Sequence, residues 1–294
     1  MPFNENKRLD PSQVQDRRGR SAGKTIAIGG GGISLVVLLV SLLFGVDLSD
    51  LTGMVADVPS VSETIINEDN NLEAECQTGA DANSRDDCRI VGFVNSIQAF
   101  WADEFAFQGS EYISADTVLF SGSTQGACGY ASGATGPFYC PRDQKVYVDL
   151  SFFDTIRTRF GAQGGPFAEA YVLSHEYGHH VQNLVGILDT SGGLRDTGPQ
   201  SLSVFTELQA DCLAGVWTHN ATETGYLEPL TRQEITQSLD AVASVGDDHI
   251  QSMTQDYVSP EAWTHGSSEQ RLQAFEDGLH TGDISTCDTP GWRP

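Results

Sequence analysis

Basic residues are scarce in this chain of 294 residues, in which 16 Lys and Arg stand against 40 Asp and Glu. Because binding to a nucleic-acid backbone depends on Lys and Arg, the formal net charge of −24 argues against a nucleic-acid partner. The sequence also has no C-x-x-C pair, which argues against a zinc ribbon or a thioredoxin-like redox site. The hydrophobic fraction of 39% is nevertheless large enough for a core, so wholesale disorder is excluded.

Charge is absent altogether from residues 25–46. As a helix, these 22 residues would be about 33 Å long, close to the hydrocarbon thickness of a bilayer. Residues 1–24 carry six basic and three acidic side chains, whereas residues 47–294 have a net charge of −27. By the positive-inside rule we expect a basic cytoplasmic tail at 1–24, a transmembrane helix at 25–46 and export of the rest.

A cleaved signal peptide is the main alternative for this uncharged segment. The segment is longer than the ~7–15 residues of a typical signal-peptide core, and no small-x-small cleavage site follows it. We therefore favour an uncleaved, single-pass anchor in the cell membrane, with the N-terminus in the cytoplasm and the following domain outside it.

All six cysteines follow the uncharged segment, which agrees with export. An even number of cysteines in an exported domain is most simply explained by three disulfides, for which 15 connectivities exist. Proximity in the sequence suggests the pairs Cys76–Cys88, Cys128–Cys140 and Cys212–Cys287.

Composition and periodicity divide the exported part into an acidic linker at 47–84 and one domain at 85–294. The linker is rich in Asp, Glu, Asn, Ser and Thr, with few aromatic residues. In the domain, apolar spacing predicts a helix after Cys88, strands at 117–120 and 145–150, and helices at about 167–185, 203–219, 231–245 and 267–279. The glycine-rich loop 121–144 is expected to be a disulfide-stapled hairpin. This order of elements predicts an α+β fold, with a small sheet and helices that carry the active site.

The expected helix at 167–185 contains His175-Glu176-Tyr177-Gly178-His179. Residues four apart lie one turn apart on the same helix face, so His175 and His179 can direct ring nitrogens at one metal ion. Glu176 projects beside them, where it can hold a water molecule. This is the H-E-x-x-H arrangement of zinc metalloproteases. The alternative is a helix face with two solvated or core histidines, but the apolar residues on either side favour a buried helix.

A catalytic zinc needs a third protein ligand and an open position for water. Glu207 and Asp211 lie one turn apart on the expected helix at 203–219. Glu207 can complete a His₂Glu site, and Asp211 can accept a hydrogen bond from the far ring nitrogen of a ligating histidine. The alternative is a solvated acidic face, but the helix is largely apolar, and two carboxylates that face a core need a partner.

His265 is the candidate donor to the oxyanion of a tetrahedral intermediate, because it lies just before the expected helix at 267–279. Arg271, in the same segment, is expected to pair with a carboxylate near the site. The alternative is that Ser267 caps the helix while His265 and Arg271 are ordinary surface residues. His180 is rotated about 100° from His179, so it is predicted to be a structural or supporting residue and not a ligand.

Several further segments match a known family in order along nearly the whole chain. They are L-F-G-V-D at 43–47, F-S-G-S-T-Q-G-A-C-G at 120–129, G-P-F-Y-C-P at 136–141, V-Y-V-D-L-S-F-F at 146–153, E-L-Q-A-D-C at 207–212 and T-H-G-S-S-E-Q-R at 264–271. With the histidine motif, they resemble the neutral zinc metallopeptidases of bacteria, a membrane-anchored family. The resemblance implies a bound Zn²⁺ and a zincin-like peptidase fold, but no particular substrate.

These features predict metal-assisted hydrolysis of a peptide or protein substrate outside the cytoplasm. His175, His179 and Glu207 are expected to hold zinc, Glu176 to act as general base, and His265 to stabilise the oxyanion. The strand at 145–150 is expected to pair with an extended substrate. Two alternatives remain at this stage: a zinc-stabilised, anchored binding or scaffold domain without turnover, and a hydrolase of non-peptide amides in the cell wall.

Overall fold

In the computed structural model, the structure describes residues 3–19, 71–188, 196–255 and 257–287. Its main sheet has four strands in the order β1-β2-β6-β5. β1 (Val14–Asp16), β2 (Asp116–Phe120) and β6 (Lys145–Asp149) are parallel, and β5 (Phe138–Cys140) is antiparallel to β6. The apolar side chains of β2 and β6 are buried along most of each strand, as expected for strands covered on both faces.

The disulfide-stapled hairpin predicted within 121–144 is confirmed. β3 (Ser123–Gly126) and β4 (Gly129–Ser132) pair as a separate antiparallel hairpin. The Cys128–Cys140 disulfide ties the turn of this hairpin to β5. The other two predicted disulfides, Cys76–Cys88 and Cys212–Cys287, are also present.

The long helices begin and end within a few residues of the predicted boundaries, and three of them have a local capping signal at the N-terminus. Ser201 caps one helix, and Thr231 and Ser267 form capping boxes with Glu234 and Gln270. The long helices are α5 (Asp86–Phe107), α7 (Pro166–Leu184), α8 (Leu202–Asn220), α9 (Arg232–Ser244) and α11 (Ser268–Thr281). Four shorter helices were not predicted from the sequence: α3 (Leu72–Glu75), α4 (Gly79–Ser84), α6 (Ser151–Arg159) and α10 (Asp247–Thr254).

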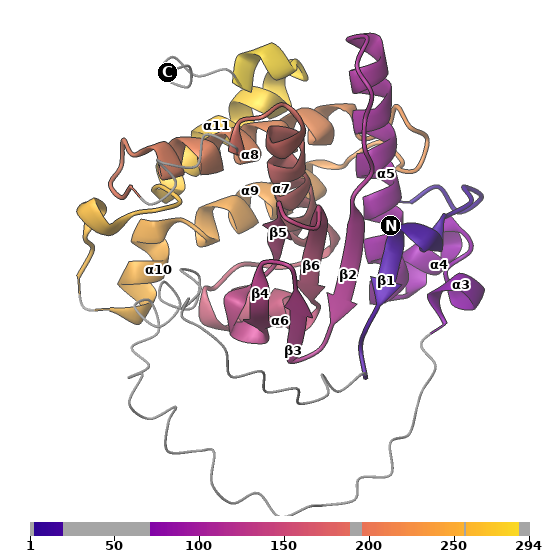
Figure 1. Ribbon diagram of the computed structural model, residues 1–294, viewed down its shortest axis with the longest axis horizontal. Helices are drawn as coiled ribbons and strands as arrows, with labels where there is room; N and C mark the ends of the chain where they lie inside the picture. The colour runs from indigo at the N-terminus through magenta and orange to yellow at the C-terminus, as the bar shows by residue number, and fades with distance from the viewer. Residues whose placement is uncertain (1–2, 20–70, 189–195, 256, 288–294) are drawn as a thin grey trace, which may run out of the picture.

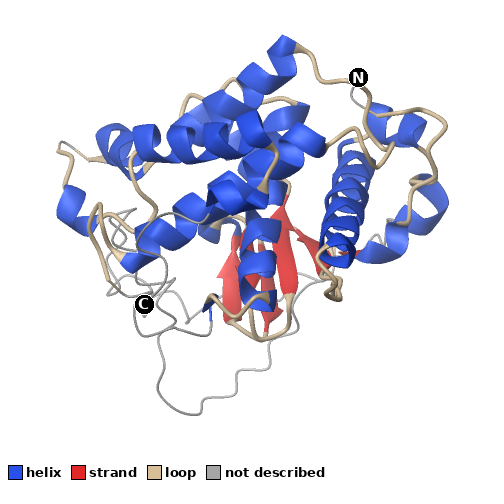
Figure 2. Ribbon diagram, turned by 90° about the horizontal axis from the view of Figure 1, so that it is seen from above, coloured by secondary structure: helices blue, strands red, loops and turns tan. Residues whose placement is uncertain are grey.

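The helices α7, α8, α9 and α11 form the part of the domain that carries the candidate site (Figure 1). Viewed from above, helices lie on several sides of the strands (Figure 2). α8 and α11 cross at glycines, since a Cβ atom on Gly215 would lie 2.1 Å from the carbonyl oxygen of Phe275. Likewise, a Cβ atom on Gly278 would lie 2.0 Å from the carbonyl oxygen of Cys212. This close approach holds the second half of α11 against α8 at residues 212–216.

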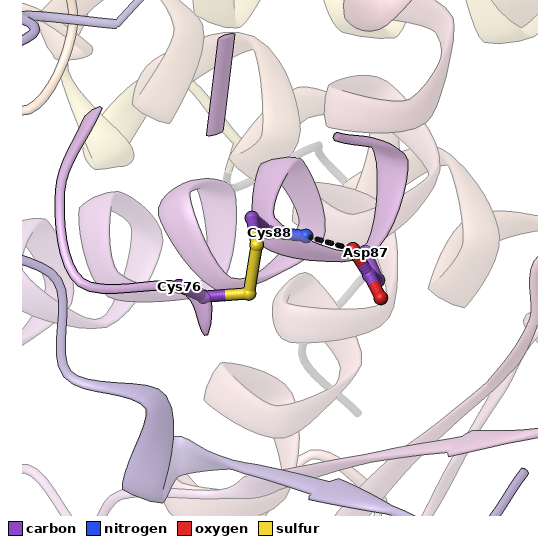
Figure 3. A group of neighbouring side chains, drawn as sticks. All are labelled: Cys76, Asp87 and Cys88. Atoms are coloured by element: carbon purple, nitrogen blue, oxygen red, sulfur yellow. Dashed lines mark hydrogen bonds between the residues drawn. A yellow bond between two sulfur atoms is a disulfide. The ribbon is translucent and has the colours of Figure 1, made fainter. Parts of the chain in front are cut away.

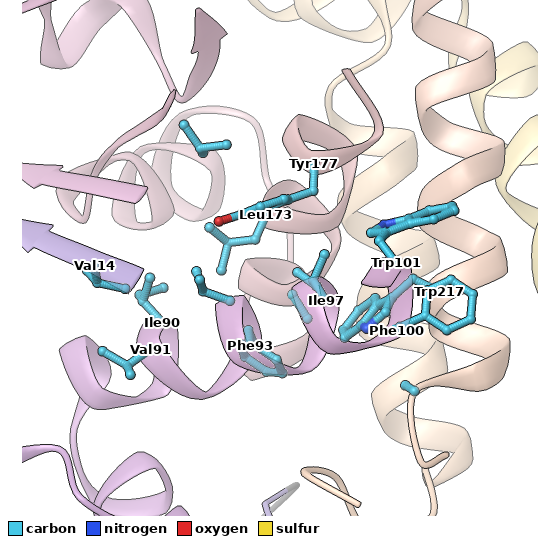
Figure 4. Packing of buried hydrophobic residues seen from close by; sticks show 14 of the residues in the cluster. Val14, Ile90, Val91, Phe93, Ile97, Phe100, Trp101, Leu173, Tyr177 and Trp217 are labelled. Carbon is cyan, nitrogen blue, oxygen red and sulfur yellow. The ribbon is translucent and has the colours of Figure 1, made fainter. Parts of the chain in front are cut away.

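The largest of three hydrophobic clusters in the described residues connects α5 to the site helices. Phe93 of α5 contacts Phe167 of α7 and Trp217 of α8 through edge-on ring contacts at centroid distances of 5.8 and 6.3 Å. Figure 4 shows Phe93 and Ile97 on the same helix as Ile90, which lies beside Val14 of β1. Burial of these large side chains is the main force that holds α7 and α8 in a fixed arrangement.

Two predicted domain boundaries differ from the structure. Residues 3–18, predicted to belong to a separate tail at 1–24, contribute β1 and three buried apolar side chains, Phe3, Leu9 and Val14. The linker predicted at 47–84 contains α3 and α4, which pack against α5. The tail and the end of the linker are polar in composition, but a few well-placed apolar residues in each are enough to join the core.

The transmembrane helix predicted at 25–46 lies outside the described residues. Within the four described ranges, no helix combines the length and the apolar character that crossing a bilayer requires.

Candidate metal centre

The three predicted metal ligands meet between α7 and α8. His175 and His179 lie one turn apart on α7, and Glu207 lies on the facing side of α8. The Oε2 atom of Glu207 is 3.1 Å from Nε2 of His175 and 3.5 Å from Nε2 of His179. One potential ligand atom from each residue lies within 4.8 Å of the other two.

This spacing fits one tetrahedral metal ion. With metal–ligand bonds of 2.0–2.2 Å, neighbouring ligand atoms of a tetrahedral site are about 3.4 Å apart. The observed separations of 3.1 and 3.5 Å between nitrogen and oxygen atoms bracket that value. Two imidazoles and one carboxylate are also the ligand types of a catalytic zinc site, which leaves a fourth position open.

A glycine within the motif lets the two helices approach each other. A Cβ atom on Gly178 would lie 2.9 Å from the carbonyl oxygen of Ala210 and 3.0 Å from its Cα atom. Both contacts are with the backbone of α8, so no side-chain rotation can relieve them. A side chain at position 178 would therefore separate α7 from α8, and with it Glu207 from the two histidines.

Asp211 holds His175 in place from the opposite side of the ring. Its Oδ1 atom is 2.8 Å from Nδ1 of His175, so Nε2 of that ring is the nitrogen directed at Glu207. Asp211 is fully buried and also accepts hydrogen bonds from Arg271 and from the hydroxyl of Tyr171. A carboxylate that orients a ligating histidine in this way fixes the tautomer of the ring and raises its basicity.

Gln182 performs the corresponding role for His179, although it was not predicted from the sequence. Its Oε1 atom is 2.8 Å from Nδ1 of His179, and its Nε2 donates to the carbonyl oxygen of Thr206 and to Oε1 of Gln209. The available signal was its position three residues after His179, on the same face of α7. Both ligating rings are thus held through their Nδ1 atoms.

The electrostatics of the site favour an ionised Glu207 and Asp211. Burial raises the pKa of Asp211, but Arg271 and His175 outweigh it and lower the pKa to about 2. Burial likewise raises the pKa of Glu207, but His179 and His265 hold it well below the usual range. For His179, burial lowers the pKa, but the Glu207 carboxylate outweighs it and raises the pKa to about 9. The Glu207 carboxylate is therefore paired with a protonated His179, and a cation bound by both side chains would replace that proton.

Glu176 lies beside the three ligands but is not one of them. Its side chain is buried, at 8% exposure, and its charge contributes to the raised pKa of His179. Within the described part of the chain, Glu176 forms no ion pair or side-chain hydrogen bond. A carboxylate in this position is available to a water molecule or to a substrate.

His265 is positioned by Asp247, a second residue that the sequence analysis missed. One oxygen of Asp247, at the start of α10, accepts the backbone N–H groups of Thr264, His265 and Gly266. Its other oxygen is 3.4 Å from Nδ1 of His265. The His265 side chain is 41% exposed, so a substrate can reach it, and its charge contributes to the low pKa of Glu207.

Two more predicted residues have clear structural partners. Arg271 of α11 is buried and donates to both carboxylate oxygens of Asp211, so it pairs with a carboxylate of the site as expected. His180 is fully buried and interacts with the hydroxyl of Tyr139 and the carbonyl oxygen of Ile113. His180 therefore joins α7 to β5 and is directed away from the three ligands.

The strand predicted at 145–150 to pair with a substrate is largely paired within the sheet. This strand is β6, which pairs with β2 along one edge and with β5 along the other. All five residues of β6 pair with β2, and Lys145, Val146 and Tyr147 also pair with β5, so these three residues have no free edge for a substrate. The outermost strand on this side of the sheet is β5, which contacts α7.

Two other features are not part of this centre. Cys76, Asp87 and Cys88 form a second group of potential metal ligands, but the cysteines are joined in a disulfide (Figure 3). A cavity of about 250 Å³ lies between α6 and the start of α7. Its lining includes Arg89 and Glu169, which form an ion pair, and none of the three candidate ligands.

We expect Gly178→Ala to weaken zinc binding about tenfold, the effect typical of a disturbed support for a metal ligand. The added Cβ atom moves α8 by roughly 0.5 Å, which is about the tolerance of a preorganised site. Zinc affinity is measured by competition with a chromophoric chelator, and circular dichroism of the metal-free variant checks that it is folded. Unchanged zinc affinity would show that α7 and α8 do not need this close contact to form the site.

The chain is similar to a known protein family and to bacterial proteins of similar sequence. A family model described as "Putative neutral zinc metallopeptidase" matches residues 3–290. The uncharacterized protein Rv2575 of Mycobacterium tuberculosis is 48% identical over 226 residues, which cover 74% of each chain. The uncharacterized protein YpfJ of Escherichia coli K12 is 38% identical over 298 residues, or 97% of each chain. No solved structure matches the chain.

Proposed function

Because this chain belongs to the neutral zinc metallopeptidase family, we propose that it is a zinc-dependent peptidase whose metal is held by His175, His179 and Glu207. The observation that carries the proposal is the convergence of these three side chains beside a buried fourth group, Glu176. A site that only bound metal for stability would need the three ligands but not this additional carboxylate.

Each residue has a role that follows from its position. His175, His179 and Glu207 would hold the zinc, which would supply polarisation of a carbonyl group and a lowered pKa for a water molecule. Glu176 accepts the proton of the attacking water and then delivers it to the leaving amine. His265 donates a hydrogen bond to the oxygen of the scissile carbonyl as negative charge develops there. Asp247 keeps His265 in position through the backbone contacts of residues 264–266.

The compartment proposed for this activity is an oxidising one outside the cytoplasm. All six cysteines are paired in disulfides, and disulfides persist in exported proteins but are rare in the cytosol. The strongly acidic composition gives a soluble surface and agrees with a peptide or protein substrate, not a nucleic acid.

The test is a digest of a peptide library by the full-length protein, together with metal analysis. We expect about one zinc ion per chain, cleavage of peptide bonds, loss of cleavage on treatment with a chelator, and recovery when zinc is added back. Zinc binding without cleavage of any peptide would contradict the proposal and favour a metal-stabilised binding domain. Cleavage that survives complete removal of metal would contradict the zinc mechanism.

A further inference from the structure

Residues 3–18 precede the uncharged segment 25–46, yet they are part of the same folded unit as the metal centre. Phe3 is 2% exposed, and its ring lies 4.8 Å from the ring of Phe93 in α5. Val14 begins β1, which pairs in parallel with β2 from Val14 opposite Thr117 to Asp16 opposite Leu119. In Figure 4, Val14 lies beside Ile90 of α5. The first strand of the sheet therefore comes from the chain before the uncharged segment.

The basic side chains of this segment have partners inside the domain. The ammonium group of Lys7 donates to the carbonyl oxygen of Thr224 at 2.7 Å and lies 4.3 Å from the ring centre of Tyr226. Arg17 donates to the carbonyl oxygen of Gln125. The positive charges of Lys7 and Arg17, which the positive-inside rule assigns to the cytoplasm, therefore contact carbonyl oxygens and an aromatic ring of the folded domain.

The chain on either side of residues 19–70 contacts the first turn of α5. On the incoming side, Arg18 pairs with Asp87 at 2.9 Å and with Asp16. On the returning side, Cys76 forms a disulfide with Cys88, the neighbour of Asp87 (Figure 3). Asp87 is 7% exposed, so the loss of Arg18 would leave its buried carboxylate with one fewer cation.

A second cation joins the two ends of the interval. Arg85, just before α5, pairs with Asp87 and also with Glu75 of α3. These contacts hold the chain at residue 18 close to the chain at residues 75–76. We call the group formed by Arg18, Arg85, Asp87 and the Cys76–Cys88 disulfide the clasp. Its cysteine and aspartate side chains are used in this structural role and not as metal ligands.

From this clasp and strand β1 we infer that residues 3–18 and 71–287 lie on the same side of the membrane. A single crossing of the bilayer between Arg18 and Asn71 would place these two parts on opposite sides, which their packing as one folded unit excludes. This topology replaces the single-pass anchor expected from the sequence, and it does not depend on the proposed peptidase activity.

The first test asks whether Phe3 contacts α5 in the full-length protein. A Cβ atom on Gly92 would lie 2.5 Å from Cε1 of Phe3, so Gly92→Ala displaces the ring. We expect Gly92→Ala to lower the unfolding midpoint by several degrees in the native sequence, as overpacking does. In the Phe3→Ala background, the same substitution should have much less effect, because the clash is gone. Equal effects in the two backgrounds would overturn the inference.

The second test measures which side of the membrane each segment occupies. Glu5 and Glu73 are exposed residues on either side of the interval, and each is replaced by Cys in the full-length chain. All six native cysteines are in disulfides, so the introduced thiol is the reactive one. With a membrane-impermeant maleimide on intact spheroplasts, we expect the two variants to be labelled alike, before and after lysis. Labelling of one variant before lysis and of the other only afterwards would overturn the inference.

Discussion

Glu176→Gln is expected to reduce peptide hydrolysis by about 10²–10⁴-fold while the zinc content stays unchanged. The amide has the size and shape of the carboxylate but cannot accept the proton of the attacking water, and general base catalysis contributes rate factors of this size. Zinc is retained because Glu176 is not among the three side chains whose ligand atoms converge. The measurements are the initial rate on a peptide found in the library digest and the zinc content of the same preparation.

The matched control for this variant is Glu269→Gln, which neutralises an exposed carboxylate at the start of α11. We expect it to leave both the rate and the zinc content unchanged. If Glu176→Gln cleaves peptides at the native rate, then Glu176 is not the base. If it loses zinc, then Glu176 helps to hold the metal and the division of roles proposed here is wrong.

Asp211→Asn is expected to have the largest effect on stability, because it leaves the buried guanidinium of Arg271 without a negative partner. Arg271 is 4% exposed and Asp211 is fully buried. The removal of one partner from a buried ion pair lowers the free energy of unfolding by about 3–5 kcal/mol. His175 also loses the carboxylate at its Nδ1 atom, so zinc affinity should fall by about 10–100-fold. Urea unfolding of the metal-free protein and a zinc competition titration measure the two effects separately.

A double variant separates these two roles of Asp211. Asp211→Asn combined with Arg271→Met removes both charges and replaces the guanidinium by an apolar side chain of similar length. Such replacements of buried pairs are often neutral, so most of the lost stability should return. Zinc affinity should stay low, because His175 still lacks its carboxylate partner. Native zinc affinity in the double variant would show that Asp211 acts on the metal only through the fold.

The candidate metal centre was largely predictable because its signals are local. His175 and His179 are four residues apart on one helix, and Glu207 and Asp211 are four apart on another, so helix geometry alone aligns each pair. The three disulfides could be predicted from proximity in the sequence, and the helix ends from capping residues such as Ser201 and Thr231. These features depend on contacts between residues that are near each other in the chain.

Support for the site was harder to predict, because it is formed by residues that are distant in the sequence. Tyr171 and Arg271 reach Asp211 across 40 and 60 residues. Asp247 holds His265 from the start of α10, a helix of only eight residues. No spacing rule links such residues, since their contacts exist only after α8 and α11 have packed at Gly215 and Gly278.

By itself, the sequence was enough to predict the α+β class from the order of the elements, and the candidate metal ligands and candidate general base from helix periodicity. Only the tertiary structure decided that residues 3–18 belong to the domain. The strand β1 is three residues long, and its partner β2 lies about a hundred residues later. The uncharged segment at 25–46 led to the prediction of a separate tail at 1–24. In the structure, burial of Phe3, Leu9 and Val14 joins this part of the chain to the domain. Contacts between residues far apart in the chain therefore set the position of residues 3–18, and a local sequence pattern cannot predict such contacts.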